Sequence, residues 1–119
     1  MKLLLTSLLL TLSILAANLS GKWTGTFVDD AEKGKNDGMV LILTQDGNTL
    51  TGTAGPTADE QMAISNGKID GANVTFDLKA EAVMVHFTLQ LVGAHLKGQA
   101  NAEVAGEKHS GTIDLTRSE

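Results

Sequence analysis

Residues 83–104, VMVHFTLQLVGAHLKGQANAEV, contain the pattern that decides the fold. Apolar and polar residues alternate on both sides of Gly93-Ala94, and this period of two is typical of a half-buried β-strand. Folding the chain back at Gly93-Ala94 places Leu91 opposite Leu96 and keeps polar residues together on the other face. The same turn pairs three further inward positions: Leu89 with Gly98, Phe87 with Ala100 and Val85 with Ala102.

Similar β-prone runs recur at roughly ten-residue intervals after Gly21, and no apolar pattern of helical period is sustained. Joined by consecutive hairpins, eight such strands form a meander that closes into a barrel and so removes its exposed edges. We therefore predict an all-β fold, an eight-stranded antiparallel up-and-down meander barrel preceded by a signal peptide. The predicted strands are 21–28, 38–45, 49–55, 61–70, 73–79, 83–92, 95–104 and 109–117.

The registers of the other hairpins follow from their turn signals. A turn at Asp46-Gly47 would place Leu43 opposite Leu50. Four-residue loops at 79–82 and 105–108 would place two more apolar pairs on the inward face: Phe76 with Val85, and Ala100 with Ile113.

In the predicted strand 61–70 the apolar residues do not all fall on one face, because Met62 and Ile64 are at even positions and Ile69 is at an odd one. A one-residue bulge at Asn66-Gly67 accounts for the change, because glycine readily adopts the left-handed conformation. The alternative is an Asn-Gly hairpin turn, which would leave two strands shorter than usual. We favour the bulge.

The N-terminus has the pattern of a secretory signal. Lys2 precedes an apolar stretch at 3–15, and small residues follow at Ala16-Ala17. An uncleaved membrane anchor is the alternative, but spanning a bilayer takes roughly 18 or more apolar residues. We predict a signal peptide at 1–17 and a single barrel domain at 18–119, secreted or periplasmic and without a membrane span after cleavage.

The composition excludes several classes of function. The 9 basic and 14 acidic side chains give a net charge of −5, whereas nucleic-acid binding normally needs a cationic face. Only four aromatic side chains are present, too few for platforms that stack on bases. The chain has no cysteine, so its fold does not depend on a disulfide framework.

Catalytic and metal sites are not expected. His109 and Ser110 are adjacent on a strand and point to opposite faces, which prevents a direct Ser–His pair. His86 and His95 would lie about 20 Å apart, beyond one coordination sphere. The acidic segment 29–37 lacks the spacing of a Ca²⁺ loop and is interpreted as solvated. We predict no enzyme activity, no metal and no cofactor.

Trp23 and Arg117 share the inward parity of the first and last strands, and both fall at the same end of the predicted barrel. The guanidinium is expected to stack on the indole and close that end. Gly21-Lys22-Trp23 resembles the G-x-W motif of the calycins, in which a basic residue of the last strand commonly caps the N-terminal Trp. Leu50-Thr51-Gly52-Thr53 resembles an avidin segment.

The resemblance to lipocalins, avidins and secreted bacterial metalloprotease inhibitors implies a small exported barrel. It does not extend to biotin binding, because avidins use several tryptophans and this chain has one. The chain also resembles uncharacterised exported bacterial proteins with a G-x-W-x-G motif, for which no activity is implied.

The candidate binding site is the end opposite Trp23, where the longer connections are expected at 29–37, 55–61, 79–82 and 105–108. These segments carry eight acidic and four basic residues, so the rim is acidic. We predict a neutral or cationic apolar small molecule, or a protein surface, as the partner. The inward residues nearest this mouth are Phe27, Met39, Met62 and His109.

Other functions remain open from the sequence. A secreted protease inhibitor could act through a loop or the N-terminal segment 18–20, and a structural envelope protein would need neither. An eight-stranded barrel can be filled by side chains or can hold one small ligand. Val40 and Ile42 are apolar and face outward, and they are expected to lie under a loop or to form a homo-oligomer contact.

Overall fold

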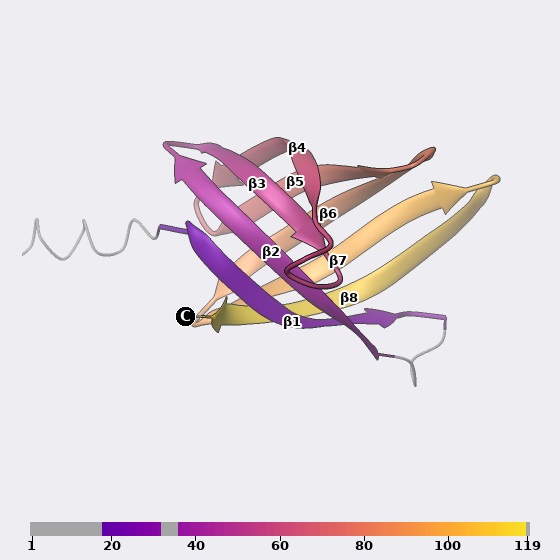
Figure 1. The fold of residues 1–119 in the computed structure, drawn as a ribbon, viewed down its shortest axis with the longest axis horizontal. Helices are drawn as coiled ribbons and strands as arrows, with labels where there is room; N and C mark the ends of the chain where they lie inside the picture. Colours follow the sequence, from indigo (N-terminus) through magenta and orange to yellow (C-terminus); the bar gives the residue numbers. More distant parts are fainter. Residues whose placement is uncertain (1–17, 32–35, 119) are drawn as a thin grey trace, which may run out of the picture.

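The computed structural model describes residues 18–31 and 36–118, so the predicted signal peptide at 1–17 lies outside the described residues. Eight antiparallel strands form a closed barrel in chain order, which confirms the predicted architecture (Figure 1). In the described part of the chain, no helix is long and apolar enough to cross a membrane. The strands are β1 (Gly21–Asp29), β2 (Asn36–Asp46), β3 (Thr49–Gly55), β4 (Met62–Asp70), β5 (Asn73–Ala80), β6 (Val83–Val92), β7 (His95–Val104) and β8 (Glu107–Ser118).

The β6–β7 register agrees with the prediction, with Leu91 opposite Leu96. The other three predicted registers are wrong by two residues. Leu43 lies opposite Gly52 rather than Leu50, and the other observed pairs are Phe76 with Phe87 and Gly98 with Ile113.

The position of the β2–β3 turn, one residue later than predicted, and the shorter length of the other two turns explain these shifts. The connections are the two-residue turns Gly47-Asn48, Glu81-Ala82 and Ala105-Gly106, so the expected four-residue loops do not exist. The first residue of each turn has a positive φ, of 64°, 58° and 53° respectively. A positive φ at this position matches the twist of a two-residue hairpin. A shift of two residues keeps every side chain on its face, so the predicted inward face is correct.

The bulge at Asn66-Gly67 is confirmed. Strand β4 runs unbroken, and its pairing with β3 and β5 shifts by one residue around this dipeptide. Asn66 rather than Gly67 adopts the left-handed conformation, with a φ of 54°. Gly67 is required for another reason, because a Cβ there would collide with the carbonyl oxygen of Leu50.

The two ends of the barrel are packed differently. Around Trp23 the interior is filled by large buried side chains: Leu19, Leu41, Leu43, Leu50, Leu89, Leu96 and Leu115. Both ends of the described chain lie at this closed end (Figure 1).

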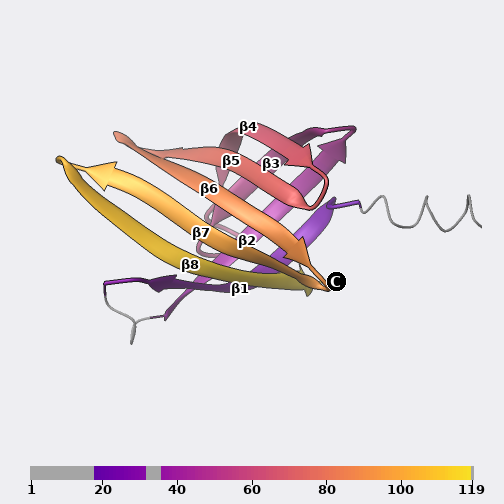
Figure 2. The same cartoon turned by 180° about the vertical axis from the view of Figure 1, so that it is seen from behind.

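At the opposite end the strands separate. Strands β6 and β7 are paired as far as Val85 and Ala102, although they continue to Val83 and Val104. The tips of the β5–β6 and β7–β8 hairpins therefore extend past the barrel as two separate arms (Figure 1 and Figure 2). We call this the open end.

Candidate ligand cavity at the open end

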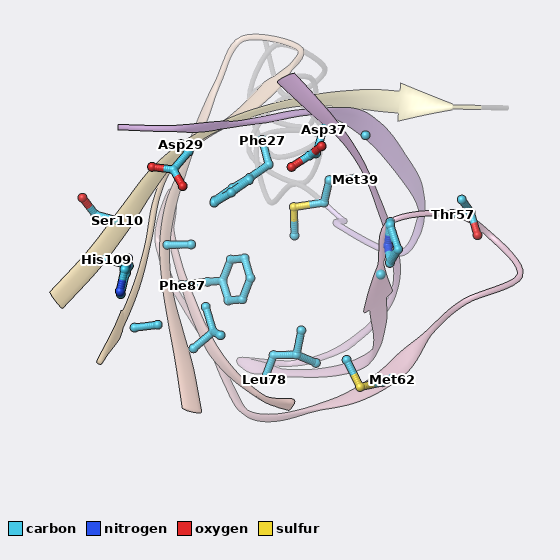
Figure 3. A pocket seen from close by; sticks show the side chains of 16 residues that line it. Phe27, Asp29, Asp37, Met39, Thr57, Met62, Leu78, Phe87, His109 and Ser110 are labelled. Carbon is cyan, nitrogen blue, oxygen red and sulfur yellow. The ribbon is translucent and has the colours of Figure 1, made fainter. Parts of the chain in front are cut away.

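A cavity of about 560 Å³ occupies the open end of the barrel (Figure 3). Phe87 lines the cavity and is stacked on the buried ring of Phe76, with the ring centroids 4.6 Å apart. The other apolar lining side chains are Phe27, Met39, Pro56, Met62, Leu78, Val85, Ala100 and Ala102.

The cavity exists because small residues alternate with large ones across neighbouring strands. Phe87 lies opposite Ala100, which in turn lies opposite Gly111. The ring of Phe27 packs against Gly111, where a Cβ would collide with it. An eight-stranded barrel is just wide enough for its side chains to fill, so a row of two small residues leaves space beside Phe87.

All four residues predicted at the mouth line this one cavity: Phe27, Met39, Met62 and His109. Met39 is buried, Phe27 is half-buried, and Met62 is 42 % exposed at the rim. Figure 3 shows His109 on one side of the cavity and Met62 on the other, with Phe27 and Met39 between them. Whether these residues bind a ligand stays a prediction.

Several other lining residues of the cavity were not expected at the site from the sequence. Leu78, Val85, Ala100 and Ala102 have the same inward parity as the predicted four, so alternation was the available signal. Thr57 lies in the exposed connection between β3 and β4 and had no such signal.

The rim carries acidic groups. Asp29 and Asp37 line the cavity. Glu107 lies near His109, with Oε1 of the glutamate 4.0 Å from Nε2 of the imidazole. No lysine or arginine is among the lining side chains of the described residues. The expected acidic character of this end therefore extends to the cavity wall.

Ser110 and Asp30 join the end of β1 to β8. The Ser110 hydroxyl donates to Asp30 Oδ2 at 2.8 Å, and the Thr112 hydroxyl donates to Asp30 Oδ1 at 3.0 Å. The Asp30 backbone N–H donates to the carbonyl oxygen of Ser110. The Ser110 hydroxyl is thus engaged with a carboxylate and does not pair with His109. Within 18–31 and 36–118, no three metal-binding side chains lie close enough to hold an ion.

The closed end is capped by Trp23, Arg117 and the N-terminal segment. The Arg117 guanidinium carbon lies 4.6 Å from the centroid of the Trp23 ring. Its nitrogens donate to the carbonyl oxygens of Ser20 at 2.5 Å and Asn18 at 2.7 Å. The indole N–H of Trp23 donates to the carbonyl oxygen of Leu19, whose side chain is only 2 % exposed. The segment is therefore packed against the barrel rather than protruding.

The two histidines of the outer face are paired separately. His86 contacts the carboxylate of Asp77, and His95 lies 2.7 Å from that of Asp114. The hydrogen bond from Asn66, followed by the contact with His86, lowers the pKa of Asp77 below its ordinary value.

Val40 and Ile42 differ in exposure. Ile42 is 40 % exposed, whereas Val40 is half-buried. The Gln61 side chain donates to the Val40 carbonyl oxygen at 3.1 Å and accepts a hydrogen bond from the Thr53 hydroxyl at 2.6 Å. The connection between β3 and β4 thus fastens onto Val40, which leaves Ile42 as the exposed member of the pair.

Comparisons with protein-family models, curated proteins and solved structures give no significant match to this chain.

Proposed function

We propose that the protein is a non-enzymatic binding module that holds an apolar small molecule in the cavity at the open end. The observation that carries the proposal is the cavity of about 560 Å³ with a mainly apolar lining. Small-molecule sites are typically concave, largely apolar and of about 300–1,000 Å³, with a few polar groups at defined positions. Met39 and Met62 contribute flexible side chains that adapt to ligands of different shape.

The chemistry at the rim supports binding rather than catalysis. A serine nucleophile most often pairs with a histidine that acts as its general base, and a carboxylate orients that histidine. The Ser110 hydroxyl donates to Asp30, and the carboxylate nearest to His109 lies 4.0 Å away. These contacts serve the structure of the rim.

Export and a calycin-like origin belong to the same proposal. The predicted signal peptide at 1–17 would direct the chain out of the cytoplasm. The Trp23–Arg117 stack at the closed end is the arrangement that the calycin resemblance implies. Together these features suit a carrier outside the cytoplasm.

Protease inhibition through the segment 18–20 is less well supported. Such a mechanism needs the segment to protrude into a protease cleft, but Leu19 is buried and Arg117 binds the carbonyl groups on both sides of it. Releasing the segment would expose Leu19 and the indole of Trp23.

Titration with Nile red, a neutral apolar dye whose emission rises in an apolar environment, tests the proposal. We expect saturable binding by the wild-type protein. Ala100→Leu should weaken it by about tenfold or more, because the added carbons occupy the cavity beside Phe87. Ala63→Leu is the matched control, since Ala63 is an exposed residue of β4 with outward parity.

Thermal unfolding of each variant shows whether it is folded. If Ala100→Leu is too unstable, Ala102→Leu provides the same test nearer the mouth, where the side chain is half-buried. Unchanged dye affinity in a folded cavity variant would show that the dye binds elsewhere and would contradict the proposal.

A further inference from the structure

We infer that the cavity selects an amphiphile with a cationic head group, held between the carboxylates of Asp29 and Asp37 while its apolar body enters the barrel. This inference rests on the proposed function and adds the charge of the ligand and the residues that recognise it. Three features of the rim support it: the placement of the two carboxylates, their few hydrogen bonds within the described chain and the orientation of nearby described cations.

The two carboxylates flank an aromatic ring at the cavity wall. In the β1–β2 ladder Asp37 lies directly opposite Phe27, and Asp29 is the next inward position on β1. Figure 3 shows the carboxylates on either side of the Phe27 ring. A cation at this place would meet two negative charges and an aromatic ring, which also attracts cations.

Within the described chain these carboxylates accept fewer side-chain hydrogen bonds than Asp30 does. Both oxygens of Asp30 accept hydrogen bonds from β8 side chains. Asp29 Oδ1 accepts a hydrogen bond from the backbone N–H of Ala31 at 2.8 Å, and no described residue donates to its Oδ2. An ionised carboxylate has about four acceptor sites, so Asp29 and Asp37 can each receive a cationic donor.

Nearby cations in the described chain point away from the cavity. Lys79 and Lys108 have outward parity on β5 and β8, whereas Glu107 shares the inward parity of His109. Among the described residues, and apart from His109, the inward acidic and basic side chains at this end are therefore all acidic. Because the cavity wall is apolar, a charge there is less well screened than in bulk water. An anionic head group would be repelled.

Three probes with the same ten-carbon chain test this inference: decyltrimethylammonium, decanol and decanoate, each used below its aggregation concentration. Displacement of Nile red gives their relative affinities. We expect the cation to bind about tenfold more tightly than decanol, which is the ratio for about 1.4 kcal/mol, and decanoate to bind most weakly. Raising the salt concentration should reduce the differences, since screening weakens charge attraction at the rim.

The double variant Asp29→Asn, Asp37→Asn tests whether these two carboxylates cause the preference for the cationic probe. It should lower affinity for the cation about tenfold and leave decanol binding unchanged, because the neutral probe uses only the apolar wall. Asp70→Asn is the matched control, since Asp70 is an exposed carboxylate of β4 beside the Gly71-Ala72 turn of the closed end.

The outcomes separate the two proposals. Equal affinity for all three probes would overturn the charge inference and leave the apolar carrier intact. A preference for the cation that survives in the double variant would overturn the assignment to Asp29 and Asp37. Failure of the wild-type protein to bind Nile red or any of the probes would overturn both.

Discussion

Replacing Arg117 by Ala removes three interactions from the closed end at once. The guanidinium stacks on Trp23, and it donates to the backbone carbonyl oxygens of Ser20 and Asn18. These contacts hold the N-terminal segment so that Leu19 covers the indole and accepts its N–H. Arg117→Ala should therefore loosen the segment as well as remove the stack.

The expected cost follows from the exposure of Arg117. Stacking at an exposed site contributes about 0.5–1 kcal/mol. Each hydrogen bond contributes about 0.5–1 kcal/mol, near the lower limit of its range, because water can replace the guanidinium at an exposed carbonyl. The free energy of unfolding should fall by about 2 kcal/mol, and the melting temperature of a domain of this size by about 8 °C.

Urea unfolding followed by tryptophan fluorescence measures both effects, because Trp23 is the only tryptophan in the chain. The wild-type emission should be blue-shifted, since the side chain is only 2 % exposed. Arg117→Ala should shift the folded-state emission to the red and lower the urea midpoint. Lys22→Ala is the matched control, because it removes a positive charge from an exposed position beside Trp23 and should change stability little.

Arg117→Lys separates the contribution of the positive charge from that of the planar guanidinium. It keeps the charge and loses the planar fork, so its stability should fall between those of wild type and Arg117→Ala. If Arg117→Ala has the same urea midpoint and the same folded-state emission as the wild type, the contacts of Arg117 with Trp23 and the N-terminal segment do not stabilise the barrel. A wild-type emission typical of exposed tryptophan would refute the placement of Trp23 itself.

Two further predictions concern the outer face. The pKa of Asp77 is lowered by Asn66 and then His86, so its carboxylate stabilises the fold above the ordinary pKa of about 4, and this contribution is lost as the pH falls through the lowered value. Asn66→Gly keeps the left-handed backbone but removes the hydrogen bond to Asp77, so it should lower the free energy of unfolding by less than about 1 kcal/mol at pH 7. The difference in unfolding free energy between variant and wild type should disappear near pH 2, where Asp77 is protonated. Urea unfolding at both pH values measures this difference, and a difference that is the same at both would disprove the prediction. If the exposed Ile42 forms a homo-oligomer contact, Ile42→Lys should lower the mass measured by light scattering. The double variant Val40→Lys, Ile42→Lys is less specific, because it would also disturb the contact of Gln61 with Val40. A monomeric wild type would eliminate this surface as an interface.

The sequence determined the features that depend on local rules. Alternation with a period of two assigned the inward face, and turn residues gave eight strands whose ends agree with the structure to within two residues. Strand direction then fixed which residues share an end of the barrel. This is why Trp23 and Arg117 could be paired in advance, and why Phe27, Met39, Met62 and His109 were expected near one mouth.

Only the tertiary structure decided the registers, the cap and the shape of the cavity. A register shift of two residues leaves every side chain on its face, so the alternation of apolar and polar residues cannot detect it. The first turn residues Glu81 and Ala105 adopt a positive φ although neither is a glycine, so the sequence did not indicate these two-residue turns. Leu19 precedes the first strand and has no alternating partners, so its burial depends on contacts with Trp23 and the β1–β2 end of the closed barrel. The volume of the cavity likewise depends on which large and small residues from distant strands lie in one row, a property of barrel closure that no single segment contains.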